Sequence, residues 1–155
     1  MVQKAVPQTV EADQQTINLA VQLAAAAALV VVMTLVHGLG LVGIAKLFKL
    51  KKERLQEHDF NGRAVVLMCS VALALFALHM LEISLFAAFY IMVNAMHSLE
   101  EALYYSASAY ATLGRTADYF PSEWRLIGAI EALIGFLLIG WSTAFIVRYI
   151  DQLRR

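Results

Sequence analysis

Charged residues are scarce in this sequence. They make up 15% of its 155 residues, whereas apolar residues make up 61%. Soluble domains carry about 25% charged residues, so the composition indicates a membrane protein. The formal net charge is zero, which removes the basic excess that nucleic-acid binding depends on. We therefore expect the lipid bilayer, and no nucleic acid, as a partner.

Cysteine is scarcer still, because Cys69 is the only one. A single cysteine excludes a disulfide within the chain. It lies inside an apolar run, where we interpret it as a small residue facing lipid or the protein core. The chain also lacks an internal repeat and an HExxH-type spacing, and we expect no enzymatic activity. After the apolar runs are set aside, too little chain remains for a separate soluble domain.

Three apolar runs are each long enough to cross a bilayer, which takes about 20 helical residues. They predict an all-α membrane protein with three transmembrane helices. The expected organisation begins with a polar segment at 1–16, a first transmembrane helix at 17–48 and a basic linker at 49–63. A second unit covers 64–155 and contains an outer helix from 64 to about 93 and an inner helix at 125–148.

Basic residues flank two of these runs. Six of them lie at the end of the first run and in the linker, and three follow the last run; they are Lys46, Lys49, Lys51, Lys52, Arg54, Arg63, Arg148, Arg154 and Arg155. Positive residues beside a span mark the cytoplasmic side of a membrane. The pattern predicts an N-terminus outside the cell and a cytoplasmic C-terminus.

Between the second and third runs lies a polar stretch, residues 97–124. Ser98 followed three residues later by Glu101 is a capping-box pattern and predicts a helix at 98–111. A helix of this length is too short to cross a bilayer. The loop at 112–122 follows it, and the chain then enters the third run. Such irregular backbone is tolerated at membrane depth only in a protein interior or beside water, so we predict a re-entrant pore helix and loop.

The polar stretch and the run after it carry a family resemblance. ALYYSASAYATLG ending at Gly114, then EWRL at 123–126 and EALIGFLLIGWSTA from Glu131, resemble bacterial potassium-channel-type pore domains of the two-helix class. The resemblance implies an ion channel in the bacterial inner membrane, with the helix at 17–48 as an addition. Each chain supplies one loop, so closed symmetry must supply the others; the resemblance sets their number at four, a homotetramer.

The resemblance weakens inside the filter. The family reads Thr-Val/Leu-Gly-Tyr-Gly-Asp, and this chain retains only the first part of that pattern; the aligned residues are Thr112, Leu113, Gly114, Arg115, Thr116 and, after Ala117, Asp118. The threonine hydroxyl and backbone carbonyls can still replace the hydration shell of a monovalent cation such as potassium. We therefore expect a weakly selective or altered channel. Inward-facing Arg115 would favour anions, whereas an outward-facing one would face water or pair with Asp118, Glu123 or Glu100. A non-conducting relative is a third alternative.

Two residues of the third run are candidates for supporting the filter. Glu131 lies about 9 Å into the inner helix at 1.5 Å per residue, and a carboxylate there needs a partner. We expect a brace to Arg115, Ser106 or Ser108, with a role in the ion pathway as the alternative. Gly135 matches the hinge position of the family, although glycines in spans are as often packing contacts.

One further polar pair, His79 and Glu82, lies three residues apart in the second run, on one helical face. Two ligands are too few for a closed metal site, so we expect a hydrogen-bonded brace and no metal or resident cofactor. A second alternative class is a small haem-binding redox subunit with His37 and His79 as axial ligands, although their estimated depths differ by about 8 Å.

Overall fold

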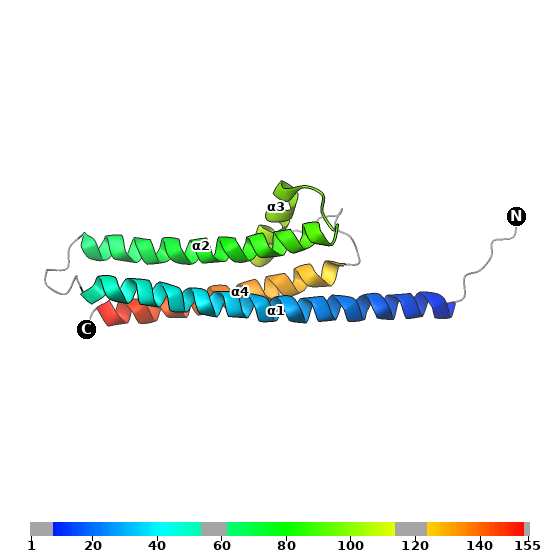
Figure 1. The fold of residues 1–155 in the computed structure, drawn as a ribbon, viewed down its shortest axis with the longest axis horizontal. Helices are drawn as coiled ribbons and strands as arrows, with labels where there is room; N and C mark the ends of the chain where they lie inside the picture. Colours follow the sequence, from blue (N-terminus) through cyan, green and yellow to red (C-terminus); the bar gives the residue numbers. More distant parts are fainter. Residues whose placement is uncertain (1–7, 54–61, 114–123, 154–155) are drawn as a thin grey trace, which may run out of the picture.

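Four helices make up the described part of the chain. The computed structural model describes residues 8–53, 62–113 and 124–153, and places helices α1 at Gln8–Glu53, α2 at Arg63–Met92, α3 at Leu99–Tyr110 and α4 at Arg125–Leu153 (Figure 1). These described residues form no strand. The prediction of an all-α protein is confirmed.

Three of the helices are long and apolar enough to cross a membrane, at Leu19–Phe48, Val65–Met92 and Arg125–Asp151. The prediction of three transmembrane helices is therefore confirmed. Their large apolar side chains are widely exposed in the single chain, as expected where lipid is the solvent.

Helix α1 differs from its prediction at both ends. It begins at Gln8, inside the segment predicted only to be polar, and continues to Glu53, well into the predicted linker. At 46 residues it is about 69 Å long, and its first turns extend past the other helices (Figure 1). The added turns include three glutamines, a glutamate and an alanine at one end, and three lysines, a leucine and a glutamate at the other. These are strong helix formers, and a formed span can propagate into them at little cost.

The transmembrane helices form a three-helix bundle. Helices α1 and α4 run in the same direction and α2 runs against them (Figure 1). The ends of α1 and α4 meet where Phe48 packs against Tyr149, with ring centroids 6.5 Å apart. The two ends that carry the predicted basic clusters therefore lie at the same end of the bundle.

Two apolar clusters hold the bundle together. The one at the basic end joins α1 and α2 through buried residues such as Leu41, Phe48 and Val71. The other joins all four helices through a larger set, whose most buried members include Met33, Phe86, Tyr90, Ala102 and Ile127. Helix α3 therefore packs into the bundle near the end of α2 and the start of α4.

Gly135 permits a close approach between α4 and the backbone of α3. A Cβ added there would lie 2.5 Å from the backbone oxygen of Tyr110 and 3.0 Å from its Cα. The helix passes through Gly135 without interruption. In this structure the glycine acts as a packing contact, and its predicted hinge role stays a prediction. A Cβ added at Gly43 of α1 would have no atom within 4 Å.

Gly135→Ala should destabilise the protein, because the methyl group meets backbone atoms that cannot rotate away. Overpacking of this kind costs about 1–3 kcal/mol. The measurement is the thermal unfolding midpoint of the purified chain in one detergent. Gly43→Ala is the control and should leave the midpoint unchanged or slightly raised. Equal midpoints for Gly135→Ala and the parent would contradict the packing described here.

Candidate functional site around the short helix

Helix α3 begins where the sequence predicted, with Ser98 at its N-cap and Leu99 as its first residue. The predicted capping box is wrong in its chemistry, because Ser98 makes no side-chain cap hydrogen bond. Glu101 is exposed and Ser98 is half-buried, so water can satisfy the first N–H groups of the helix. Glu100 and Glu101 still place negative charge in the first turn, where the helix dipole favours it.

The contacts of α3 show that it descends into the bundle. Tyr105 stacks edge-on against Tyr90 of α2, with ring centroids 5.3 Å apart. About one and a half turns further along α3, Tyr110 donates a hydrogen bond to Glu82, which also lies on α2. From Tyr90 to Glu82 is about 12 Å along α2. Contacts on α4 move in the same sense, from Gly128 beside Tyr105 to Gly135 beside Tyr110.

This descent places the C-terminal end of α3 near the middle of the membrane. Met92 ends α2 and its candidate span, and Glu82 lies about 15 Å further into that span. The hydrocarbon core is about 30 Å thick. The short helix therefore enters from the Met92 end and stops about halfway across, as expected of a re-entrant helix.

The chain leaves α3 through a strained turn. The amide of Leu113 donates to the carbonyl of Ser108 at 2.9 Å, and the amide of Thr112 donates to that of Ala109 at 2.8 Å. These two bonds form a Schellman motif, whose left-handed position is usually glycine. Here Thr112 occupies it, with φ of 57°. A β-branched residue in that region is an outlier of the kind found at functional sites.

Only the first two predicted filter residues lie in the described part of the chain. Thr112 and Leu113 are exposed at the tip of α3. The remaining candidates lie outside the described residues; they are Gly114, Arg115, Thr116 and Asp118.

Glu131 is fully buried behind α3 and is held by two hydroxyl groups. Tyr90 of α2 donates to its Oε2 at 2.5 Å, and Ser106 of α3 lies 2.5 Å from its Oε1. Ser106 also lies 2.9 Å from the carbonyl oxygen of Ile83. Ser106 is one of the partners expected for Glu131, whereas Tyr90 had no sequence signal. The carboxylate thus joins α2, α3 and α4.

Glu82 is the centre of a second polar cluster at the tip of α3. His37 Nδ1 lies 2.8 Å from its Oε1, and His79 Nδ1 lies 3.2 Å from its Oε2. Tyr110 donates a hydrogen bond to Oε2 as well. Ser142 of α4 lies 3.4 Å from Nε2 of His37. The cluster therefore draws a residue from every helix.

The predicted pair of His79 and Glu82 is thus part of a larger arrangement that the sequence did not reveal. His37 was expected about 8 Å from His79 in depth, but their ring centroids are 5.4 Å apart. That estimate is wrong because α1 is long and its offset against α2 depends on packing. Both Nδ1 atoms contact one carboxylate, which fills the place between them. A porphyrin between axial histidines does not fit this arrangement.

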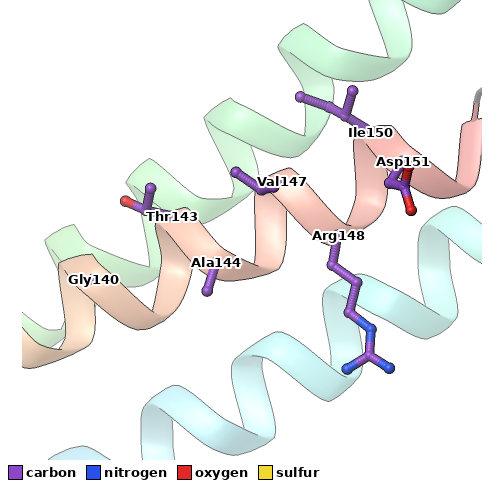
Figure 2. Close-up of a pocket in the computed structure, with 7 residues that line it drawn as sticks. All are labelled: Gly140, Thr143, Ala144, Val147, Arg148, Ile150 and Asp151. Carbon is purple, nitrogen blue, oxygen red and sulfur yellow. The ribbon is translucent and has the colours of Figure 1, made fainter.

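The described surface of α4 carries an open groove. Its lining residues all belong to α4, from Gly140 to Asp151, with Thr143, Ala144 and Val147 among them and the charged Arg148 at one end (Figure 2). The groove lies on the half of α4 away from α3, toward the basic end of the bundle. A second helix or water can therefore approach α4 there.

Comparison with known protein families gives a match. A family model described as an ion channel matches residues 66–152, more than half of the chain. The matched segment begins inside α2, includes α3 and ends within α4, so it leaves out α1. No curated protein and no solved structure gives a match.

Ser106→Ala should destabilise the protein more than Ser98→Ala. Ser106 is buried between Glu131 and Ile83, so its removal leaves buried polar groups short of a partner, at a cost of about 1–3 kcal/mol. Ser98 makes no cap bond, and its replacement should change stability by less than about 0.5 kcal/mol. Unfolding of both variants in one detergent measures the difference. A larger loss of stability for Ser98→Ala than for Ser106→Ala would contradict this ranking and would support a capping hydrogen bond from Ser98.

Proposed function

Because the chain belongs to an ion channel family, we propose that it is a homotetrameric channel resembling potassium channels, with an altered filter that selects weakly among monovalent cations. The match to an ion channel model over residues 66–152 supports the channel activity. The number of subunits, the permeant ion and the degree of selectivity are our inference from the filter sequence and from the geometry of α3.

The observation that carries the proposal is the position of the C-terminal end of α3. That end stops about halfway across the membrane, where its partial negative charge favours cations. Glu82 and Glu131 lie buried on either side of its last turns, and no lysine or arginine of the described residues forms an ion pair with them. The surroundings of the tip are therefore suited to attract positive ions.

Four chains would complete the pathway. One tip of α3 cannot enclose an ion, and closed rotational symmetry brings identical tips to a common axis. The single chain leaves much of α4 uncovered, including Leu133, Phe136 and the groove toward Asp151. We propose that α4 meets its copies along this uncovered surface and lines the water-filled part of the pathway.

The proposed orientation follows from the basic ends of α1 and α4. Both ends lie together, and clustered lysine and arginine mark the cytoplasmic side. The N-terminus would then lie outside, and α3 would enter from the outside. We place the channel in a bacterial inner membrane, as the resemblance of the pore sequence implies.

The altered filter is the basis for weak selectivity. Thr112 and Leu113 follow the potassium-channel pattern, whereas Arg115 and Thr116 replace the tyrosine and second glycine that follow the first glycine. Inner coordination by threonine and backbone oxygens can persist. Four Arg115 side chains near one axis would repel one another and a cation by several kcal/mol in total at an effective dielectric constant of about 20.

The detergent-solubilised protein should have the mass of four chains, because one α3 tip per chain requires symmetric closure. Light scattering coupled to size exclusion, with the detergent contribution subtracted, measures that mass. A monomer or dimer as the only species at all protein concentrations would rule out the proposed pore.

Arg115→Gln should raise cation conductance, or lower anion conductance, because it removes positive charge from the outer mouth of the pathway. The measurement is ion flux into liposomes under potassium, sodium and chloride gradients. Arg125→Gln is the matched control, since Arg125 is exposed at the start of α4, and it should leave the reversal potential unchanged.

Three outcomes of this experiment would count against the proposal. Unchanged conductance in Arg115→Gln would show that this side chain lies outside the pathway. Tight potassium selectivity in the parent would show that the filter is not altered in function. A parent that conducts only anions, or nothing at all, would favour an anion-permeable or non-conducting relative.

A further inference from the structure

The cluster at the tip of α3 brings together three metal-ligating side chains. One ligand atom each from His37, His79 and Glu82 can be chosen so that all lie within 4.8 Å of one another. His37 comes from α1 and the other two from α2, so residues 45 positions apart supply the set. A third ligand, absent from the sequence pair of His79 and Glu82, is what separates this cluster from an ordinary brace.

The distances in the cluster suit a tetrahedral site. Zinc binds histidine nitrogen and carboxylate oxygen at about 2.0–2.2 Å, which places neighbouring ligand atoms about 3.3–3.5 Å apart. The histidine nitrogens already lie 2.8 Å and 3.2 Å from the carboxylate oxygens. An ion would replace these hydrogen bonds, and ligand atoms that now lie up to 4.8 Å apart would move to that spacing.

The surroundings of the cluster supply what a metal site needs beyond its ligands. Ligating histidines usually bond a second group through the other ring nitrogen, and Ser142 lies 3.4 Å from Nε2 of His37. With the metal on Nδ1, that Nε2–H would donate to the serine hydroxyl. The phenol of Tyr110, 2.8 Å from His79 Nδ1, lies where a fourth ligand or its hydrogen-bond partner is required.

Charge favours a cation in the same place. Within the described residues, the contacts of the Glu82 side chain are with two histidines and a tyrosine, and none is a lysine or arginine. A carboxylate buried in a membrane is stabilised by a cation beside it. His37 and Glu82 are fully buried, whereas the His79 side chain is 17% exposed and offers a route of entry.

We propose that His37, His79 and Glu82 form a binding site for a divalent transition metal of the zinc class, which ties α1 to α2 beside the tip of α3. Imidazole nitrogens suit such ions and not the hard cations magnesium and calcium. This site lies beside the tip of α3, and its binding of a metal does not depend on whether the protein conducts.

The test uses the untagged full-length chain in detergent, stripped of metal and titrated with Co²⁺ as a spectroscopic probe. A saturable visible absorption of four-coordinate Co²⁺ is expected at one ion per chain, and Zn²⁺ should abolish it. His37→Ala and His79→Ala should each weaken Co²⁺ binding at least about tenfold. His97→Ala, which removes an exposed histidine outside the cluster, should bind as the parent does.

A measurement on the unmodified chain covers variants that fail to fold. Zn²⁺ should protect His79 from diethyl pyrocarbonate, as mapped by mass spectrometry, and leave the exposed His97 reactive. The proposal is overturned by a parent without saturable Co²⁺ absorption, by absorption that survives unchanged in folded His37→Ala and His79→Ala, or by equal protection of His79 and His97.

Discussion

A carboxylate inside a bilayer must find its hydrogen-bond donors within the protein, because lipid provides none. Two carboxylates among the residues that the structure describes are fully buried, and each is satisfied by side chains from other helices. Glu82 is hydrogen-bonded to His37 of α1 and to Tyr110 of α3. Glu131 is hydrogen-bonded to Tyr90 of α2 and to Ser106 of α3. If any of these helices slid by one turn, a buried polar group would lose its hydrogen-bond partner. The two carboxylates therefore fix how all four helices pack.

That requirement also fixes the depth of α3. Apolar contacts alone tolerate small shifts of a short helix, since one methyl group can replace another in the same place. The hydrogen bonds at Ser106 and Tyr110 do not tolerate such shifts, because the distance from donor to acceptor can vary by only a few tenths of an ångström. The end of α3, and the strained Thr112 that follows it, are thereby held at one level in the membrane.

Length and hydropathy were enough to predict the three transmembrane helices, and the polar pattern at Ser98 located the start of α3 to one residue. Periodicity could not predict which helices meet. Tyr90 and Glu131 are 41 residues apart, and a tyrosine in an apolar run looks like an ordinary core residue. The depth of His37 was misjudged for the same reason, since the offset of two helices depends on packing. Gly114 to Asp118 lie outside the described residues, so for them the sequence remains the only guide.

The carboxylate of Glu82 connects a helix outside the matched family segment to α3, the short helix that precedes Thr112. Helix α1 precedes the ion channel match, yet its buried His37 and the phenol of Tyr110 on α3 contact the two oxygens of one side chain. A displacement of α1 must therefore break or stretch a hydrogen bond whose partner also holds the last turn of α3. Because the unpaired group would be buried, the cheaper response is for α2 or α3 to follow. Helix α1 is thus mechanically coupled to α2 and α3, although the segment that matches the family does not include it.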